Sequence, residues 1–146
     1  MIQKRDFDEA VEDIVARDTR FHPDAYGFVR DSLDYTLKKA GEDFSQGRHV
    51  SGPELLDGFR IFSLDQFGPM VMTVFTEWGL RCTRDIGEIV FNLIEVGIFG
   101  KTESDTLDDF SGVYEFQTAF DHPFLPASRL EELVRLREEG QLADRS

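Results

Sequence analysis

The chain has 146 residues, of which 40% are hydrophobic and 31% are charged, a balance typical of one folded domain rather than of a disordered segment. Sixteen Lys and Arg residues stand against 29 Asp and Glu residues, and the net charge of −13 disfavours nucleic acid and anionic membranes as partners and favours basic ones. The single cysteine, Cys82, excludes an internal disulfide bond. No apolar run reaches the length of a signal peptide or of a membrane span, so we expect a cytoplasmic protein.

Residues 1–48 carry two amphipathic helix patterns. In the first, Phe7, Val11 and Ile14 recur at helical spacing, and Asp6 and Glu9 occupy the positions of a capping box. The second pattern begins at a proline, a favoured residue in the first turn of a helix. Its apolar face is formed by Tyr26, Val29, Leu33 and Leu37.

Residues 49–120 begin with three further helix patterns. Ser51 and Glu54 are placed to form a capping box at the start of the third helix. A Gly-Pro pair at 68–69 separates the third helix from the fourth, and Gly79 is expected to end the fourth. The fifth helix is predicted over residues 83–96.

The sequence after the fifth helix predicts a β-hairpin. In "GVYEFQTAF", residues 112–120, aromatic residues alternate with more polar neighbours, which is the period of a half-buried strand. The stretch "GIFGKTE", residues 97–103, is expected to pair with it, and "RHV", residues 48–50, to add a third strand. A last helix is predicted over about residues 126–140, with Ser128 as its cap. The predicted class is therefore mostly α with a small antiparallel hairpin or sheet (α+β), in a single domain over residues 1–146.

The order of these elements from residue 53 to residue 120 resembles that of winged helix-turn-helix domains. The resemblance rests on the stretch "IVFNLIEVGIFGKTE", which resembles the connection between the DNA-recognition helix and the wing in such domains. The resemblance implies a winged-helix-like part at about residues 49–120, flanked by the N-terminal helices and the C-terminal helix. A winged-helix transcription factor is one function that it suggests.

The charge of this region argues against direct nucleic-acid binding. From residue 83 to residue 116 there are two basic and eight acidic residues, a net charge of −6. The polar strip of the fifth helix is formed by Asp85, Glu88, Asn92 and Glu95. Three carboxylates and no base on that strip repel phosphate, whereas base readout relies mainly on Arg, Lys, Asn and Gln.

Candidate catalytic and metal-binding residues are scattered. The three His residues and Cys82 lack the spacing of a metal site, and no Gly-rich loop is placed to hold phosphates, so we expect no cofactor and no metal. An alternative is a metal- or small-molecule-handling enzyme built from His49, Glu54, Glu88 and Asn92. Further polar candidates are Arg60 and Lys101.

Several stretches resemble an uncharacterised family of small acidic bacterial proteins, the Minf-type domain of unknown function. They are "HPDAYGFV", "HVSGPELLDGFR", "FGPMVMTVFTEWG", "TRDIGEIVFNLIEVG", "KTESDTLDDF" and "VYEF", which together cover most of residues 22–120. The resemblance implies a bacterial cytosolic domain and brings no activity with it.

The leading hypothesis is a non-enzymatic protein-interaction or regulatory module. Its acidic binding face would be formed by Asp85, Glu88, Asn92 and Glu95. A partly exposed Trp78 would anchor the partner, because Trp is a favoured residue at the energetic centre of interfaces. The expected partner is a protein, and a basic one.

Overall fold

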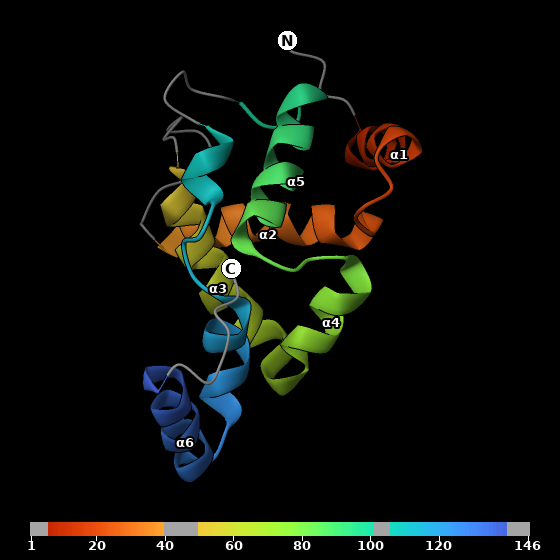
Figure 1. Cartoon of the computed structure of the whole chain (residues 1–146). Helices are drawn as coiled ribbons and strands as arrows, with labels where there is room; N and C mark the ends of the chain where they lie inside the picture. Colours follow the sequence, from red (N-terminus) through yellow and green to blue (C-terminus); the bar gives the residue numbers. More distant parts are fainter. Residues whose placement is uncertain (1–5, 40–49, 101–105, 140–146) are drawn as a thin grey trace.

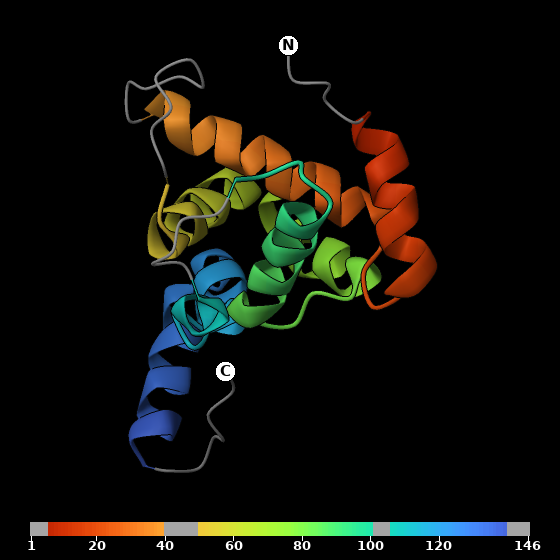
Figure 2. The ribbon, with the colours of Figure 1, turned by 90° about the horizontal axis from the view of Figure 1, so that it is seen from above.

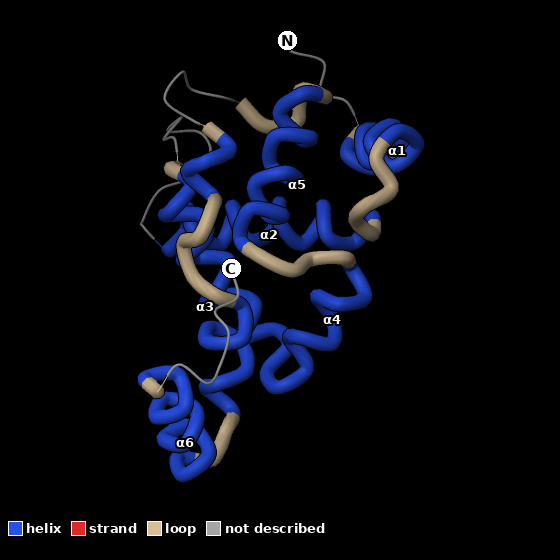
Figure 3. The backbone as a smooth tube through the Cα atoms, in the orientation of Figure 1, coloured by secondary structure: helices blue, strands red, loops and turns tan. Residues whose placement is uncertain are grey.

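The computed structural model of the chain describes residues 6–39, 50–100 and 106–139, and every regular element within these ranges is helical (Figure 3). The α-helices are α1 (Phe7–Arg17), α2 (Pro23–Lys39), α3 (Gly52–Phe67), α4 (Val71–Trp78), α5 (Thr83–Glu95) and α6 (Ala127–Glu138). Short helical turns join them: η2 (Gly68–Met70), η3 (Leu107–Phe110), η4 (Gln117–Asp121) and η5 (His122–Phe124). No helix in the described ranges combines the length and the apolar character needed to cross a membrane.

The predicted α+β class is wrong, and so is the winged-helix-like description of residues 49–120, because the described residues contain no strand. Phe116 and Phe120, predicted to alternate along a strand, are four residues apart, which also places them on one face of a helical turn. The structure has a helical turn here, η4, in which the N–H of Ala119 donates to the carbonyl of Glu115. The rings of Phe116 and Phe120 are both buried. The helical turn therefore hides the same rings that suggested a strand.

The predicted first strand of the hairpin is replaced by a helix ending. Gly97 has φ 85°, and the N–H of Ile98 donates to the carbonyl of Leu93 over 2.9 Å, which closes α5 with a left-handed cap. Residues 101–105 of the predicted hairpin and residues 48–49 of the predicted third strand lie outside the described residues.

Helix α5 stands at the centre of the helical body. It crosses α2, and α1 and α3 lie on either side of it (Figures 1 and 2). Ile86, Ile89 and Leu93 of α5 are all fully buried, as the helix periodicity predicts. A second part of the core consists of rings: Phe75 lies 5.4 Å from Phe59 and 5.0 Å from Phe120, between ring centroids. The molecule thus has one continuous core of aliphatic and aromatic side chains.

The N-termini of α1, α3 and α6 can be compared with the three predicted helix caps. Ser51 forms the predicted capping box with Glu54, since each side chain accepts the other's backbone N–H. Asp6 occupies the N-cap position of α1, but its side chain makes no capping bond. The prediction for Ser128 is wrong: α6 begins after Pro126, which leaves Ser128 inside the first turn.

Helix α6 extends away from the rest of the body (Figures 1 and 2). Arg137 ties it to the preceding segment by an ion pair with Glu115, in which Nη1 and Oε1 are 2.8 Å apart. Val134 on this helix is exposed.

Candidate functional site

The polar strip of α5, predicted as a binding face, is engaged by the chain's own residues. Asp85 accepts the backbone N–H of Arg81 over 2.8 Å. Glu88 lies 3.3 Å from the guanidinium of Arg20. Glu95 pairs with Arg17 at 3.4 Å, with most of its side chain exposed. Part of the strip therefore holds α1 and the α1–α2 turn against α5.

Asn92, the fourth member of the strip, belongs to a hydrogen-bonded cluster. Its side-chain nitrogen donates to a carboxylate oxygen of Asp18 and to the hydroxyl of Tyr26, over 3.0 Å in each case. Arg20 donates to both carboxylate oxygens of Asp18. These contacts join α5 to α2 and to the α1–α2 turn, and they use both hydrogen-bond donors of the Asn92 amide within the chain.

The pKa values in this cluster follow from its geometry. The hydrogen bond from Arg20, assisted by the bond from Asn92, holds the pKa of the Asp18 carboxyl well below its usual range. The same pairing with Asp18 raises the pKa of Arg20. Burial raises the pKa of Tyr26, because the neutral phenol is favoured away from water. All three groups are therefore held in their ordinary charge states at neutral pH.

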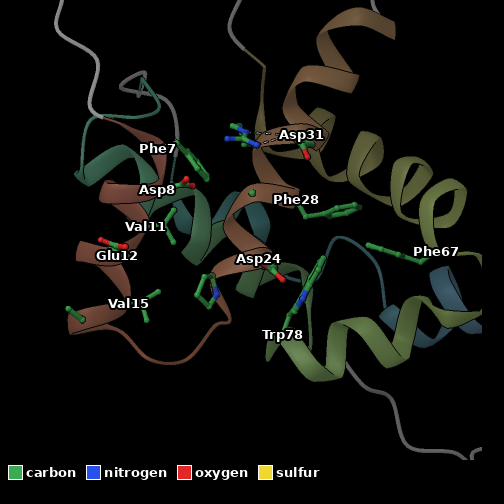
Figure 4. Close-up of a pocket in the computed structure, with 14 residues that line it drawn as sticks. Phe7, Asp8, Val11, Glu12, Val15, Asp24, Phe28, Asp31, Phe67 and Trp78 are labelled. Carbon is green, nitrogen blue, oxygen red and sulfur yellow. Dashed lines mark hydrogen bonds and ion pairs between the residues drawn. The ribbon is translucent and has the colours of Figure 1, made fainter.

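An open groove of about 920 Å³ lies over α2, between α1 and the ends of α3 and α4 (Figure 4). Phe7, Val11 and Val15 project into it from α1, and Phe67 and Trp78 form its opposite wall. Its size matches the upper part of the roughly 300–1,000 Å³ that ligand clefts in proteins occupy.

The floor of the groove is one face of α2. Asp24, Gly27, Phe28 and Asp31 recur at spacings of three and four residues, so the regular helix places them side by side. Gly27 leaves the middle of this face bare, and a carboxylate stands about one turn away on each side of it. The floor therefore combines close access to the backbone with negative charge.

Negative charge also surrounds the apolar walls. The groove is lined by the carboxylates of Asp8, Glu12, Asp24 and Asp31. Arg30 is the one basic residue among the described residues that line the groove. It lies 4.2 Å above the ring of Phe7 and donates to Asp31 over 3.3 Å, so its charge is matched by that carboxylate. A ligand entering the groove meets apolar side chains within an acidic rim.

Trp78 is the one predicted binding residue that the structure brings to this groove. Gly79, in a left-handed conformation with φ 83°, ends α4 beside it. The indole packs against Phe28 and Phe67, with ring centroids 5.4 Å and 5.7 Å apart, and remains partly exposed. It thus presents a rigid apolar surface at the edge of the cleft.

The residues predicted for an enzyme do not form a common site in the described part of the chain. Glu54 caps α3, and Glu88 and Asn92 hold the α1–α2 turn, as described above. His49 and Lys101 lie outside the described residues. Arg60 pairs with Asp57, one turn earlier on α3, at 3.0 Å. Among the described residues, no three His, Cys, Asp or Glu side chains are grouped as metal ligands.

The residue pattern alone does not predict most of the groove. One signal was available: Gly27 interrupts a helix pattern and is flanked on the same face by Asp24 and Asp31. A helix-interior glycine permits a close approach to the backbone, and acids on the same face favour a basic group there. The contribution of α1 and Trp78 depends on tertiary packing, which periodicity does not reveal.

Comparison of the chain with protein-family models, with curated proteins and with solved structures finds no match. The predicted membership of the Minf-type family stays a prediction.

Proposed function

We propose that this protein is an interaction module that holds a basic, partly apolar segment of a partner protein in the groove over α2. The observation that carries the proposal is the combination of apolar walls with four lining carboxylates, against a single arginine among the described lining residues, which pairs with one of the four, Asp31. Apolar contact supplies most of the affinity of such sites, and charge selects the partner and speeds its approach.

The sign of the charge selects among ligand classes. Nucleic acid and anionic lipid headgroups would bring phosphate to an acidic rim, at a cost that grows as salt is lowered. A Lys- or Arg-bearing segment gains from the same field. A protein with a net charge of −13 attracts such partners over its whole surface. We place this interaction in the cytoplasm of a bacterium, in line with the single unpaired cysteine and the predicted family.

Two exposed carboxylates of the groove give a direct test. Peptides that bind the immobilised full chain at low salt are selected from a random display library. We expect the selected peptides to combine Lys or Arg with large apolar residues. The double variant Glu12→Gln/Asp24→Asn should bind them about tenfold more weakly, because two matched charges are lost at the rim.

The matched control carries the same charge change outside the groove. Glu9 is exposed on α1 and Asp65 is exposed on α3, and neither lines the cleft. The variant Glu9→Gln/Asp65→Asn should bind the selected peptides about as well as the unaltered chain. Selected peptides without excess positive charge, or equal losses in the two double variants, would refute the proposal.

A further inference from the structure

Gly27 lies in the interior of α2, and no neighbour in the described part of the chain requires a glycine there. Glycine weakens a helix interior because it loses more backbone freedom on folding than alanine. A β-carbon added at Gly27 would meet no atom of the described residues within 4 Å. The fold itself would therefore accept alanine there.

The other glycines inside the α-helices of the described ranges have a structural reason. A β-carbon at Gly52 or at Gly87 would press against the ring of Phe110, at 3.2 Å and 2.6 Å respectively. A β-carbon at Gly58 would collide with the hydroxyl of Thr36. Gly27 differs because its open side faces the groove.

Resting on the proposed function, we infer that the bound segment is an amphipathic α-helix that crosses α2 at Gly27. Helices pack with axes about 8–10 Å apart, and a missing side chain at the crossing point permits the closer end of that range. Asp24 and Asp31 flank the crossing point about one turn away on either side, where they can meet Lys or Arg on the flanks of the bound helix.

A helix fits this groove better than an extended strand does. A segment that binds as an added β-strand pairs with an exposed sheet edge, and the described residues offer no strand. A helix satisfies those groups internally and presents apolar side chains at positions i, i+3, i+4 and i+7. Such a row can contact α1 on one side and Trp78 on the other.

The test uses two synthetic peptides of 18 residues with identical Leu, Ala and Lys content. In one, Leu recurs at helical spacing; in the other, Leu alternates with polar residues, so that no apolar helix face exists. Trp78 is the only tryptophan of the chain, and neither peptide contains one, so its fluorescence reports occupation of the groove. We expect the helical peptide to bind about tenfold more tightly than the alternating one.

Substitution of the glycine tests the crossing point. Gly27→Ala and Gly27→Leu should raise or maintain the urea midpoint, since both residues favour helix. Affinity for the helical peptide should fall in the order Gly, Ala, Leu, with the leucine variant at least about tenfold weaker. Thr73→Leu, at an exposed position of α4 outside the groove, should bind as the unaltered chain does.

The outcomes separate this inference from the proposed function. If both peptides bind equally and Gly27→Leu binds like the unaltered chain, the helical crossing is refuted. Loss of binding in Glu12→Gln/Asp24→Asn would then still support an acidic docking groove. If that double variant also binds normally, the proposed function fails together with the inference.

Discussion

The carboxylate of Asp18 joins two parts of the chain that are far apart in sequence. Arg20 binds it from the turn between α1 and α2, and Asn92 binds it from α5. The side chain of Asp18 is only 15% exposed, whereas that of Arg20 is 53% exposed, so solvent screens the hydrogen bond from Asn92 less than those from Arg20. The contact fixes α1, and with it one wall of the groove, against the central helix.

Asp18→Asn should therefore destabilise the fold by about 2 kcal/mol at pH 7, the typical contribution of hydrogen bonds to a charged group. Because the pKa of Asp18 is lowered in the folded state, the stabilisation is present above the unfolded value, about 3.9, and is lost as the pH falls through the lowered folded pKa. The difference in free energy of unfolding between the two proteins should thus shrink below about pH 4. Urea unfolding at pH 7 and pH 3 measures it, and an equal difference at both pH values would contradict this account.

Single residues differ in how far the sequence predicts their roles. The capping box of Ser51 and Glu54 is local, so the spacing alone identifies it. The pairing of Asn92 with Asp18 joins positions 74 residues apart, and periodicity marks Asn92 only as polar. The same kind of spacing predicts Ser128 as a cap, but α6 begins earlier, directly after Pro126.

At the scale of elements, α5 was predicted well and the hairpin was not. The helical period identifies the buried face of α5 because only one arrangement hides Ile86, Ile89 and Leu93 together. The segment of residues 112–120 is short, and the spacing of its aromatic residues fits both a strand and a helical turn. The surrounding rings decide between the two, since Phe75 packs on Phe116 and Phe120 at once.

Two variants of α5 should behave in opposite ways. Leu93→Ala removes a fully buried side chain and should lower the free energy of unfolding by roughly 2–5 kcal/mol. Glu88→Gln/Glu95→Gln removes three ion pairs near the surface, those of Glu88 with Arg20 and Arg84 and that of Glu95 with Arg17, and should cost about 1 kcal/mol or less. Urea midpoints of both variants check the pair of expectations. A neutral Leu93→Ala, or a double Gln variant as unstable as it, would mean that the helix is oriented differently.

At the scale of the whole molecule, the groove arises from the arrangement of four helices. The sequence shows that each of these residues is acidic, but it does not show that they lie together. The tertiary fold brings Asp8 and Glu12 of α1 beside Asp24 and Asp31 of α2. The net charge alone predicts a basic partner, but it does not predict where on the surface that partner binds. The α5 strip was the location suggested by sequence, and its contacts with Arg17, Arg20 and Asp18 favour the groove instead.

The central claim is that the basic, partly apolar ligand docks over α2 rather than elsewhere on the acidic surface. It is tested most directly by NMR of the isotope-labelled full chain during titration with the helical Leu/Ala/Lys peptide at low salt. The account predicts that the largest shifts occur at the backbone amides of Gly27 and Val15 and at the indole N–H of Trp78, and that Val134 on α6 stays unchanged. Shifts centred on Glu95 and the exposed end of α5, or spread evenly over the acidic surface, would contradict it.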